Sequence, residues 1–544
     1  MALDIALVLI SIISSVGLGS VFFRSVLLSL ISGLSFSALV VSPLVFVDIS
    51  LVRPLQIILF FSGLILFMKR IPLKPNKLSS RNYYNKLRKI LFNFKSLIFC
   101  ASLIIIPLIL KEFRSREYVF ENHDVLYFGW IREIWEAEYT GGVQVPTVWP
   151  QKMSAMNTIS SVVLSQLSVL GQAPNLESII TTRYIFLCTL FIIVALEYLK
   201  LSLWHLLGLA PSLISVFALY GREIFYSLGM SSFWFVVVIF ILCLELLNGK
   251  NRLNENGLVV MLAILVVSKA QIAHILLTCL IFCFWKIRKR MDRKTLIFVT
   301  LSILNLTQLF FLPKSSGANL GFPTLLAFRP TFAGGKVQVN WNEISVSSDL
   351  IVDWYLGVEK ELIYTLNLDS RAYPMLVFVL ILVKVFAPYW LSRKYLFTSK
   401  STISRTIDLY MILSALSVLF VRNGGHVGHQ AHAYLLATIV SSTFVLVAIT
   451  KSQLGKGILY PLTLAWIMTV GNPKELLPYW YQNEGKLRDY PYSSATLPLE
   501  TNMNEKEILA LKQVQYSING IRLEYDSTGD YKYSQVFKFT IIRD

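Results

Sequence analysis

Residues 257–294 read GLVVMLAILVVSKAQIAHILLTCLIFCFWKIRKRMDRK. Two apolar runs, 257–268 and 271–285, meet at the polar interruption 268–271, and a basic run follows at 286–294. Long apolar runs are typical of membrane-spanning helices, which need about 20 apolar residues to cross the hydrocarbon core. The interruption favours two short crossings over one long tilted helix, because two crossings keep the charged loops on consistent sides. We therefore predict two successive membrane helices with a basic turn after the second.

The rest of the chain repeats this pattern from end to end. It has 544 residues, of which 55% are hydrophobic and 15% are charged, whereas a soluble domain carries about 25% charged residues. We expect about fourteen transmembrane helices, within a range of about 11–14, and an all-α polytopic membrane fold. The apolar segments are 3–22, 26–46, 51–68, 96–110, 178–197, 203–219, 231–247, 257–268, 271–285, 295–312, 374–391, 406–421, 431–449 and 457–471.

The basic residues predict the orientation of these helices. Residues 69–95 contain nine Lys or Arg and no acid, and the loops 286–294 and 393–405 are also basic. Short loops rich in Lys and Arg are typical of the cytoplasmic side. The net charge of +18 is therefore explained by topology. We expect no nucleic-acid partner, because no basic face with aromatic or polar readers is evident.

Fourteen crossings would place both termini and the long polar segments on the outer side. We predict a transmembrane domain over 1–471, with outer loops at 112–177 and 314–372, and an extramembrane segment over 472–544. Alternating stretches in that segment, IRLEYDS and SQVFKFTII, predict a small α/β or β-rich unit. The N-terminal MALDIALVLI lacks a basic start, so we expect no cleaved signal peptide. In a bacterium the protein would lie in the plasma (inner) membrane.

The first outer loop is unusually acidic for this chain. Residues 111–153 read KEFRSREYVFENHDVLYFGWIREIWEAEYTGGVQVPTVWPQKM, and 112–155 hold seven acids against four bases. Helical spacing over 121–138 puts Tyr127, Ile131, Ile134 and Trp135 on one apolar face. We expect this helix, and a second amphipathic stretch MNTISSVVLSQLSVLG, to lie in the membrane interface.

Asp124 is the candidate catalytic residue of this loop. One interpretation is that it only caps the helix N-terminus, a position that Asp favours. The other is that Asp124, beside the imidazole of His123, serves as a general base or as a metal ligand. Glu121 is a further candidate acid.

This loop resembles the first outer loop of the type C (GT-C) membrane glycosyltransferases. The resemblance is carried by the order of short motifs after a transmembrane helix: His123-Asp124, Tyr127-Phe128, residues 131–136, Gly141-Gly142 and Trp149-Pro150. In layout it covers roughly residues 95–300. The chain departs from the family in having His-Asp where the family often has a pair of acids, and in having three helices before the module.

The resemblance implies an inverting glycosyltransferase that uses a sugar on a polyprenyl phosphate or diphosphate. Asp124, with His123 and Glu121, would activate a glycan, lipid or protein acceptor. Asp124 would also be the ligand of a divalent cation, Mg²⁺ or Mn²⁺, if the reaction uses one.

A second cluster, RNGGHVGHQAHAY, occupies residues 422–434 at the predicted outer mouth of a late helix. Arg422 and the glycines before a helix N-terminus favour a phosphate site, and the resemblance favours the same reading. The three histidines, His426, His429 and His432, would alternatively bind a metal or simply face headgroups. Their spacing of three residues differs from the usual zinc pattern.

Two further cations, Arg222 and Lys269, fall at the predicted outer ends of apolar runs. Each is either a partner of the donor phosphate or an interface anchor. The five cysteines all lie within apolar runs, which indicates buried free thiols.

Three other functions stay open on the sequence alone. A polysaccharide polymerase or O-antigen ligase would carry arginine-rich outer loops. A lipid-linked substrate transporter or flippase would place polar groups within the membrane and break its helices in matching halves. The third is a purely structural membrane protein.

Overall fold

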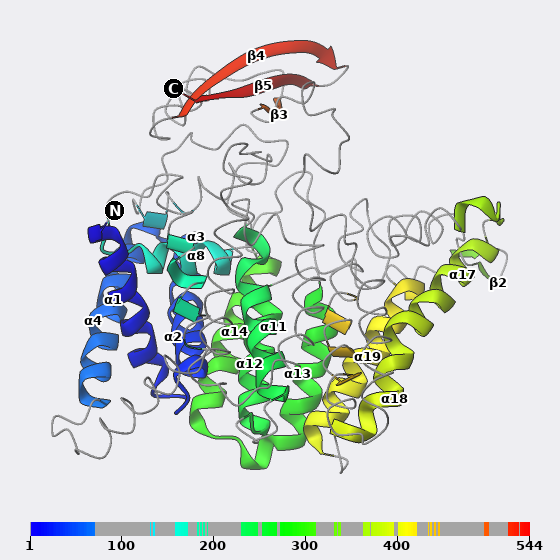
Figure 1. Cartoon of the computed structure of the whole chain (residues 1–544), viewed down its shortest axis with the longest axis horizontal. Helices are drawn as coiled ribbons and strands as arrows, with labels where there is room; N and C mark the ends of the chain where they lie inside the picture. Colours follow the sequence, from blue (N-terminus) through cyan, green and yellow to red (C-terminus); the bar gives the residue numbers. More distant parts are fainter. Residues whose placement is uncertain are drawn as a thin grey trace, which may run out of the picture.

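The computed structural model describes part of the chain, and most of that part is helical, as predicted (Figure 1). The described residues are 2–70, 158–171, 230–247, 253–268, 272–311, 331–333, 336–338, 363–369, 371–396, 401–420, 494–499, 521–531 and 534–543, with individual residues between 131 and 135, 182 and 193, and 434 and 445.

The N-terminal helices pack at very short distances. Helices α1 (Ala2–Gly19), α2 (Val26–Val41) and α4 (Val52–Arg70) lie side by side, with the short turns α3 (Leu44–Val47) and η1 (Ile49–Leu51) before α4. Glycines make this approach possible: a Cβ on Gly33 would lie 1.9 Å from the carbonyl oxygen of Ser15, and one on Gly63 would lie 2.3 Å from that of Ser14. Small residues at such crossings are a feature of membrane helix pairs.

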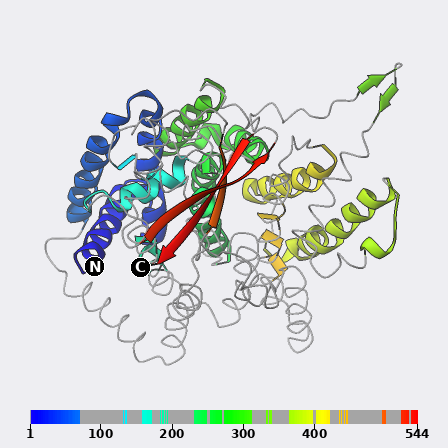
Figure 2. The ribbon, with the colours of Figure 1, turned by 90° about the horizontal axis from the view of Figure 1, so that it is seen from above.

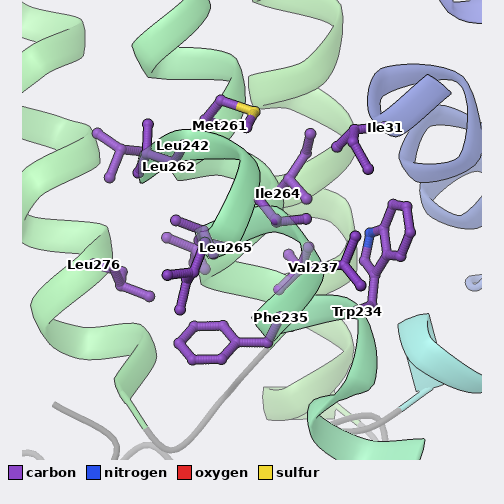
Figure 3. Close-up of a cluster of buried hydrophobic side chains, with 14 of the residues drawn as sticks. Ile31, Trp234, Phe235, Val237, Leu242, Met261, Leu262, Ile264, Leu265 and Leu276 are labelled. Atoms are coloured by element: carbon purple, nitrogen blue, oxygen red, sulfur yellow. The ribbon is translucent and has the colours of Figure 1, made fainter. Parts of the chain in front are cut away.

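The central helices confirm the prediction that residues 257–285 form two helices, divided at 268–271. Helix α12 (Glu255–Ser268) ends where the interruption begins, α13 (Ala273–Ile287) returns, and the turn η4 (Arg288–Arg290) leads into α14 (Arg293–Phe311). Every residue of α12 from Gly257 onwards is buried, because α11 (Met230–Leu247), α13 and α14 pack around it. Figure 3 shows this core, in which Trp234 and Ile31 lie beside side chains of α12.

Helix α8 (Thr158–Leu167) differs from the expected interfacial helix. All ten of its residues are buried, and it packs against α2 and α11. Two of its polar side chains, Ser165 and Gln166, form hydrogen bonds to other helices inside the bundle. This part of the predicted outer loop 112–177 therefore packs against protein.

A long helix with an irregular middle follows. Helix α17 (Ala372–Ile381), the π-helical turn η7 (Leu382–Phe386) and α18 (Ala387–Leu396) are continuous. Pro388 explains the π turn, since proline lacks the N–H that would bond to the carbonyl of Lys384 and its ring crowds that carbonyl. Helix α19 (Thr402–Phe420) then packs antiparallel to α13.

The first turn of α17 is capped by Asp369. The backbone N–H groups of Ala372 and Arg371 donate to its carboxylate at 2.6 and 2.9 Å. These hydrogen bonds, together with the charge of Arg371, hold the pKa of Asp369 below its usual value. The cap fixes where this helix begins.

The described strands form two small antiparallel sheets. Strands β1 (Thr331–Ala333) and β2 (Lys336–Gln338) pair in a hairpin, and β3 (Ser494–Leu499), β5 (Ser534–Arg543) and β4 (Ile521–Tyr531) pair in that order. Figure 2 shows the larger sheet from above, crossing over the helices. Both alternating stretches noted in the C-terminal sequence fall within its strands, in β4 and β5.

Three helices in the described part of the chain are long and apolar enough to span a membrane: Val26–Val47, Ile49–Lys69 and Ala372–Arg393. The second and third of these expose large apolar side chains, among them Ile58, Phe61 and Val383, as expected of lipid-facing helices, whereas most of Val26–Val47 is buried inside the bundle. Nine of the predicted segments coincide with helices of the described residues. Segments 178–197 and 431–449 are described only at individual residues, and segments 96–110, 203–219 and 457–471 lie outside the described residues, so the total of fourteen stays a prediction.

Candidate functional site

The helices place their basic turns at one end of the bundle. The carbonyl oxygen of Val21 accepts a hydrogen bond from Lys294, and Asn256 donates to the carbonyl oxygen of Arg290 at 3.5 Å. These contacts bring the turns before α2, α12 and α14 together. We call this the basic end, defined by the exposed side chains of Arg24, Lys69, Arg288, Lys289, Arg290 and Arg405.

The opposite end, which we call the far end, is defined by Asp48, Arg53, Ser268, Ile272 and Arg371 (Figure 1). Its described residues carry fewer cations than the basic end. This asymmetry is the pattern that the positive-inside rule describes.

The predicted site residues all lie outside the described part of the chain: Glu121, His123, Asp124, Arg222, Lys269, Arg422, His426, His429 and His432. Several of their neighbours are described. Ser268 and Ile272 flank Lys269, and Phe420 ends α19 two residues before Arg422. These neighbours lie at the far end of the bundle.

Three residues of the acid-rich loop are anchored in the bundle. Residues 131, 134 and 135 are helical, as the spacing predicts. Ile131 and Ile134 are completely buried in the main core, and the indole of Trp135 donates to the carbonyl oxygen of Ser168 at 3.1 Å. The apolar face of this segment therefore packs against protein, which differs from the expected contact with lipid headgroups.

Arg53 lies over the ring of Trp135. Its guanidinium carbon is 3.7 Å from the ring centroid, a distance typical of a cation–π stack. Arg53 is the second residue of α4, at the far end. The stack joins the N-terminal helices to the acid-rich loop.

A buried polar network continues inward from this stack. Gln56 donates to the hydroxyl of Ser165 at 2.7 Å, and Gln166 donates to the backbone carbonyl of Gln56 at 3.3 Å. The hydroxyl of Ser37 donates to the side-chain oxygen of Gln166 at 3.0 Å. These bonds link α2, α4 and α8 and satisfy polar groups that would be costly to bury alone.

A second charged group, an ion pair between Arg393 and Asp408, lies at the basic end. The guanidinium of Arg393 makes two hydrogen bonds of 2.6 Å to the carboxylate of Asp408, and the hydroxyl of Tyr389 donates to the same carboxylate. This bidentate pair holds α18 against α19. Because this ion pair joins two neighbouring helices, we interpret it as a structural contact.

The described residues contain no cluster of three His, Cys, Asp or Glu side chains that would hold a metal ion. The predicted cation ligand, Asp124, lies outside them. Cys279 and Cys283 are buried free thiols, which confirms the prediction for these two residues.

No known protein family, curated protein or solved structure matches the chain.

Arg53 is the residue that the sequence reading missed. It stands alone in an apolar run, away from the denser cationic clusters. The predicted topology does distinguish Arg53, because it places this arginine on the outer side of the membrane, where Lys and Arg are scarce.

Proposed function

We propose that the protein is a polytopic membrane glycosyltransferase that moves a sugar from a polyprenyl phosphate or diphosphate donor to an acceptor on the outer face of the membrane. The far end of the bundle would face outward, and the basic end would face the cytoplasm. The full fold would have about fourteen helices, with residues 472–544 as a β-rich outer unit.

The supporting observation is the anchoring of the acid-rich loop at the far end. Ile131, Ile134 and Trp135 tie the loop to the bundle within eleven residues of Asp124. The chain segments before Arg422 and on both sides of Lys269 end at the same side of the bundle. An acid and several cations near one membrane surface suit a reaction that activates an acceptor hydroxyl and stabilises a leaving phosphate.

The proposed roles follow from this chemistry. Asp124 takes the proton of the acceptor hydroxyl, with His123 and Glu121 as its neighbours. Arg422, the three histidines His426, His429 and His432, and the cations Lys269 and Arg222 hold the departing phosphate. A divalent cation bound at Asp124 would supply further charge stabilisation.

The function is tested with the full-length protein in liposomes. Radiolabelled polyprenyl phosphate sugars are offered with an acceptor extract, and both labelled product and released polyprenyl phosphate are measured. Formation of labelled product and released polyprenyl phosphate in equal amounts supports the proposal. Movement of intact donor between leaflets without cleavage would contradict it and favour the flippase alternative.

A further inference from the structure

The guanidinium of Arg53 has hydrogen-bonding capacity that the described residues around it do not use. Its face lies on Trp135, but a cation–π stack occupies only the face and leaves the N–H groups at the edge. The Nε atom is buried and has no hydrogen-bond partner among the described residues. Buried donors of this kind are rare without a partner.

The position of Arg53 also favours a negative partner. It lies in the first turn of α4, where the helix dipole attracts anions and opposes cations. Asp48, the described carboxylate closest to it in sequence, is directed to its own turn, where it accepts from the backbone N–H and the hydroxyl of Ser50 at 3.0 and 2.6 Å. An additional anion would therefore stabilise this arrangement.

We propose that Arg53, held on Trp135, binds the phosphate group of an anionic ligand at the far end of the bundle. A guanidinium edge matches the oxygens of a phosphate and binds two of them at once. Building on the proposed function, this phosphate belongs to the lipid-linked donor.

The surroundings of Arg53 favour a phosphate that is attached to a lipid. Gln56 and Phe60, one and two turns along α4 from Arg53, are buried, whereas Ile58 and Phe61 are 60% and 52% exposed. Arg53 is partly exposed and lies at the border between these two faces. Val47 and Leu51, just before α4, are also exposed apolar residues. A lipid chain resting on the apolar face of α4 would place its phosphate beside Arg53.

The test measures binding to the full-length protein in phosphatidylcholine nanodiscs. The probes are a polyprenyl phosphate, the matching polyprenol without phosphate, and inorganic phosphate. Arg53→Gln should weaken polyprenyl phosphate binding at least about tenfold, the loss expected when a charged hydrogen-bonded pair is removed. Arg53→Lys keeps the charge but loses the planar fork and should give an intermediate value. Polyprenol binding should not change in either variant.

Arg371→Gln is the matched control, because Arg371 is an exposed arginine just before α17 at the same end. This variant should bind like the wild type. Size-exclusion profiles and unfolding temperatures show whether each variant is folded. Equal binding by folded Arg53→Gln and wild type would overturn the proposal, as would equal binding of polyprenol and polyprenyl phosphate. Saturable binding of inorganic phosphate that depends on Arg53 would support the site and assign it to free phosphate.

Combining the binding and transfer measurements distinguishes failure of the Arg53 anion site from failure of the proposed transferase function. Loss of binding in Arg53→Gln, with no sugar transfer from any donor, would keep the anion site and reject the transferase. Transfer activity with an unchanged donor KM in Arg53→Gln would keep the transferase and reject the anion site.

Discussion

At the scale of single residues, the structure shows how a membrane protein buries polar side chains at low cost. Gln56 is 1% exposed, and its amide and backbone meet Ser165 and Gln166 of α8. Ser37 completes the connection to α2. Because every member of this network has a partner, the network specifies how α8 sits between the two helices.

This arrangement predicts the effect of removing Gln56. In Gln56→Ala the hydroxyl of Ser165 loses its donor and a cavity opens, so the protein should lose roughly 1–3 kcal/mol of stability. The measurement is thermal or denaturant unfolding in detergent micelles. Thr278→Ala is the control, since Thr278 is exposed and bonds only within its own helix. Equal stability of both variants would show that the network contributes nothing.

The residue scale also separates what the sequence reveals from what it hides. The burial of Ile131 and Ile134 was predictable in part, since their spacing marks one apolar face. The partner of that face was not predictable, because Trp135 meets Ser168, more than thirty residues away. A local pattern indicates which side chains avoid water but does not distinguish lipid from protein.

At the scale of helices, boundaries were predicted well where the sequence carries a local signal. The interruption at 268–271 and the basic turn 286–294 both mark the ends of α12 and α13. The local sequence does not indicate whether α8 lies at the membrane surface or inside the bundle. Its serines and its glutamine suit a solvated surface as well as a buried helix contact. The choice depends on Ser37 and Gln56, which are more than a hundred residues away from it.

Close packing of α1, α2 and α4 makes the glycine positions sensitive. In Gly33→Ala the new methyl group would lie 1.9 Å from a backbone oxygen of α1, and relief requires the helices to separate. The expected loss of stability is roughly 1–3 kcal/mol, typical of overpacking. The measurement is again unfolding in micelles.

Gly171 provides the matched control for this substitution. Among the described residues, a Cβ there would meet only the carbonyl oxygen of Ser168, at an ordinary 3.4 Å. Gly171→Ala should therefore leave the unfolding temperature unchanged. A tolerated Gly33→Ala would mean that α1 and α2 are less tightly packed than described.

At the scale of the whole molecule, the separation of charge between the two ends of the described bundle predicts the orientation in the membrane. The basic end gathers cations from turns that are far apart in sequence. Cationic loops are retained on the cytoplasmic side, so the far end should face outward. The predicted reaction depends on this, because the described segments that flank Lys269 and precede Arg422 end at the far end.

Single-cysteine labelling tests the orientation. Lys289→Cys, at the basic end, should react with a membrane-impermeant maleimide only after the membrane is opened. Asp48→Cys, at the far end, should react in intact cells. The wild type provides the background, and its described thiols, Cys279 and Cys283, are buried. Labelling of both variants from the same side would contradict the orientation.

The central claim is that sugar transfer depends on Asp124, and Asp124→Asn tests it most directly. The substitution keeps the size of the side chain but removes the base, so the rate of transfer from a polyprenyl phosphate sugar in liposomes should fall at least about a hundredfold. The folded, inserted variant should keep the unfolding temperature of the wild type. Wild-type transfer rates in Asp124→Asn would contradict the account.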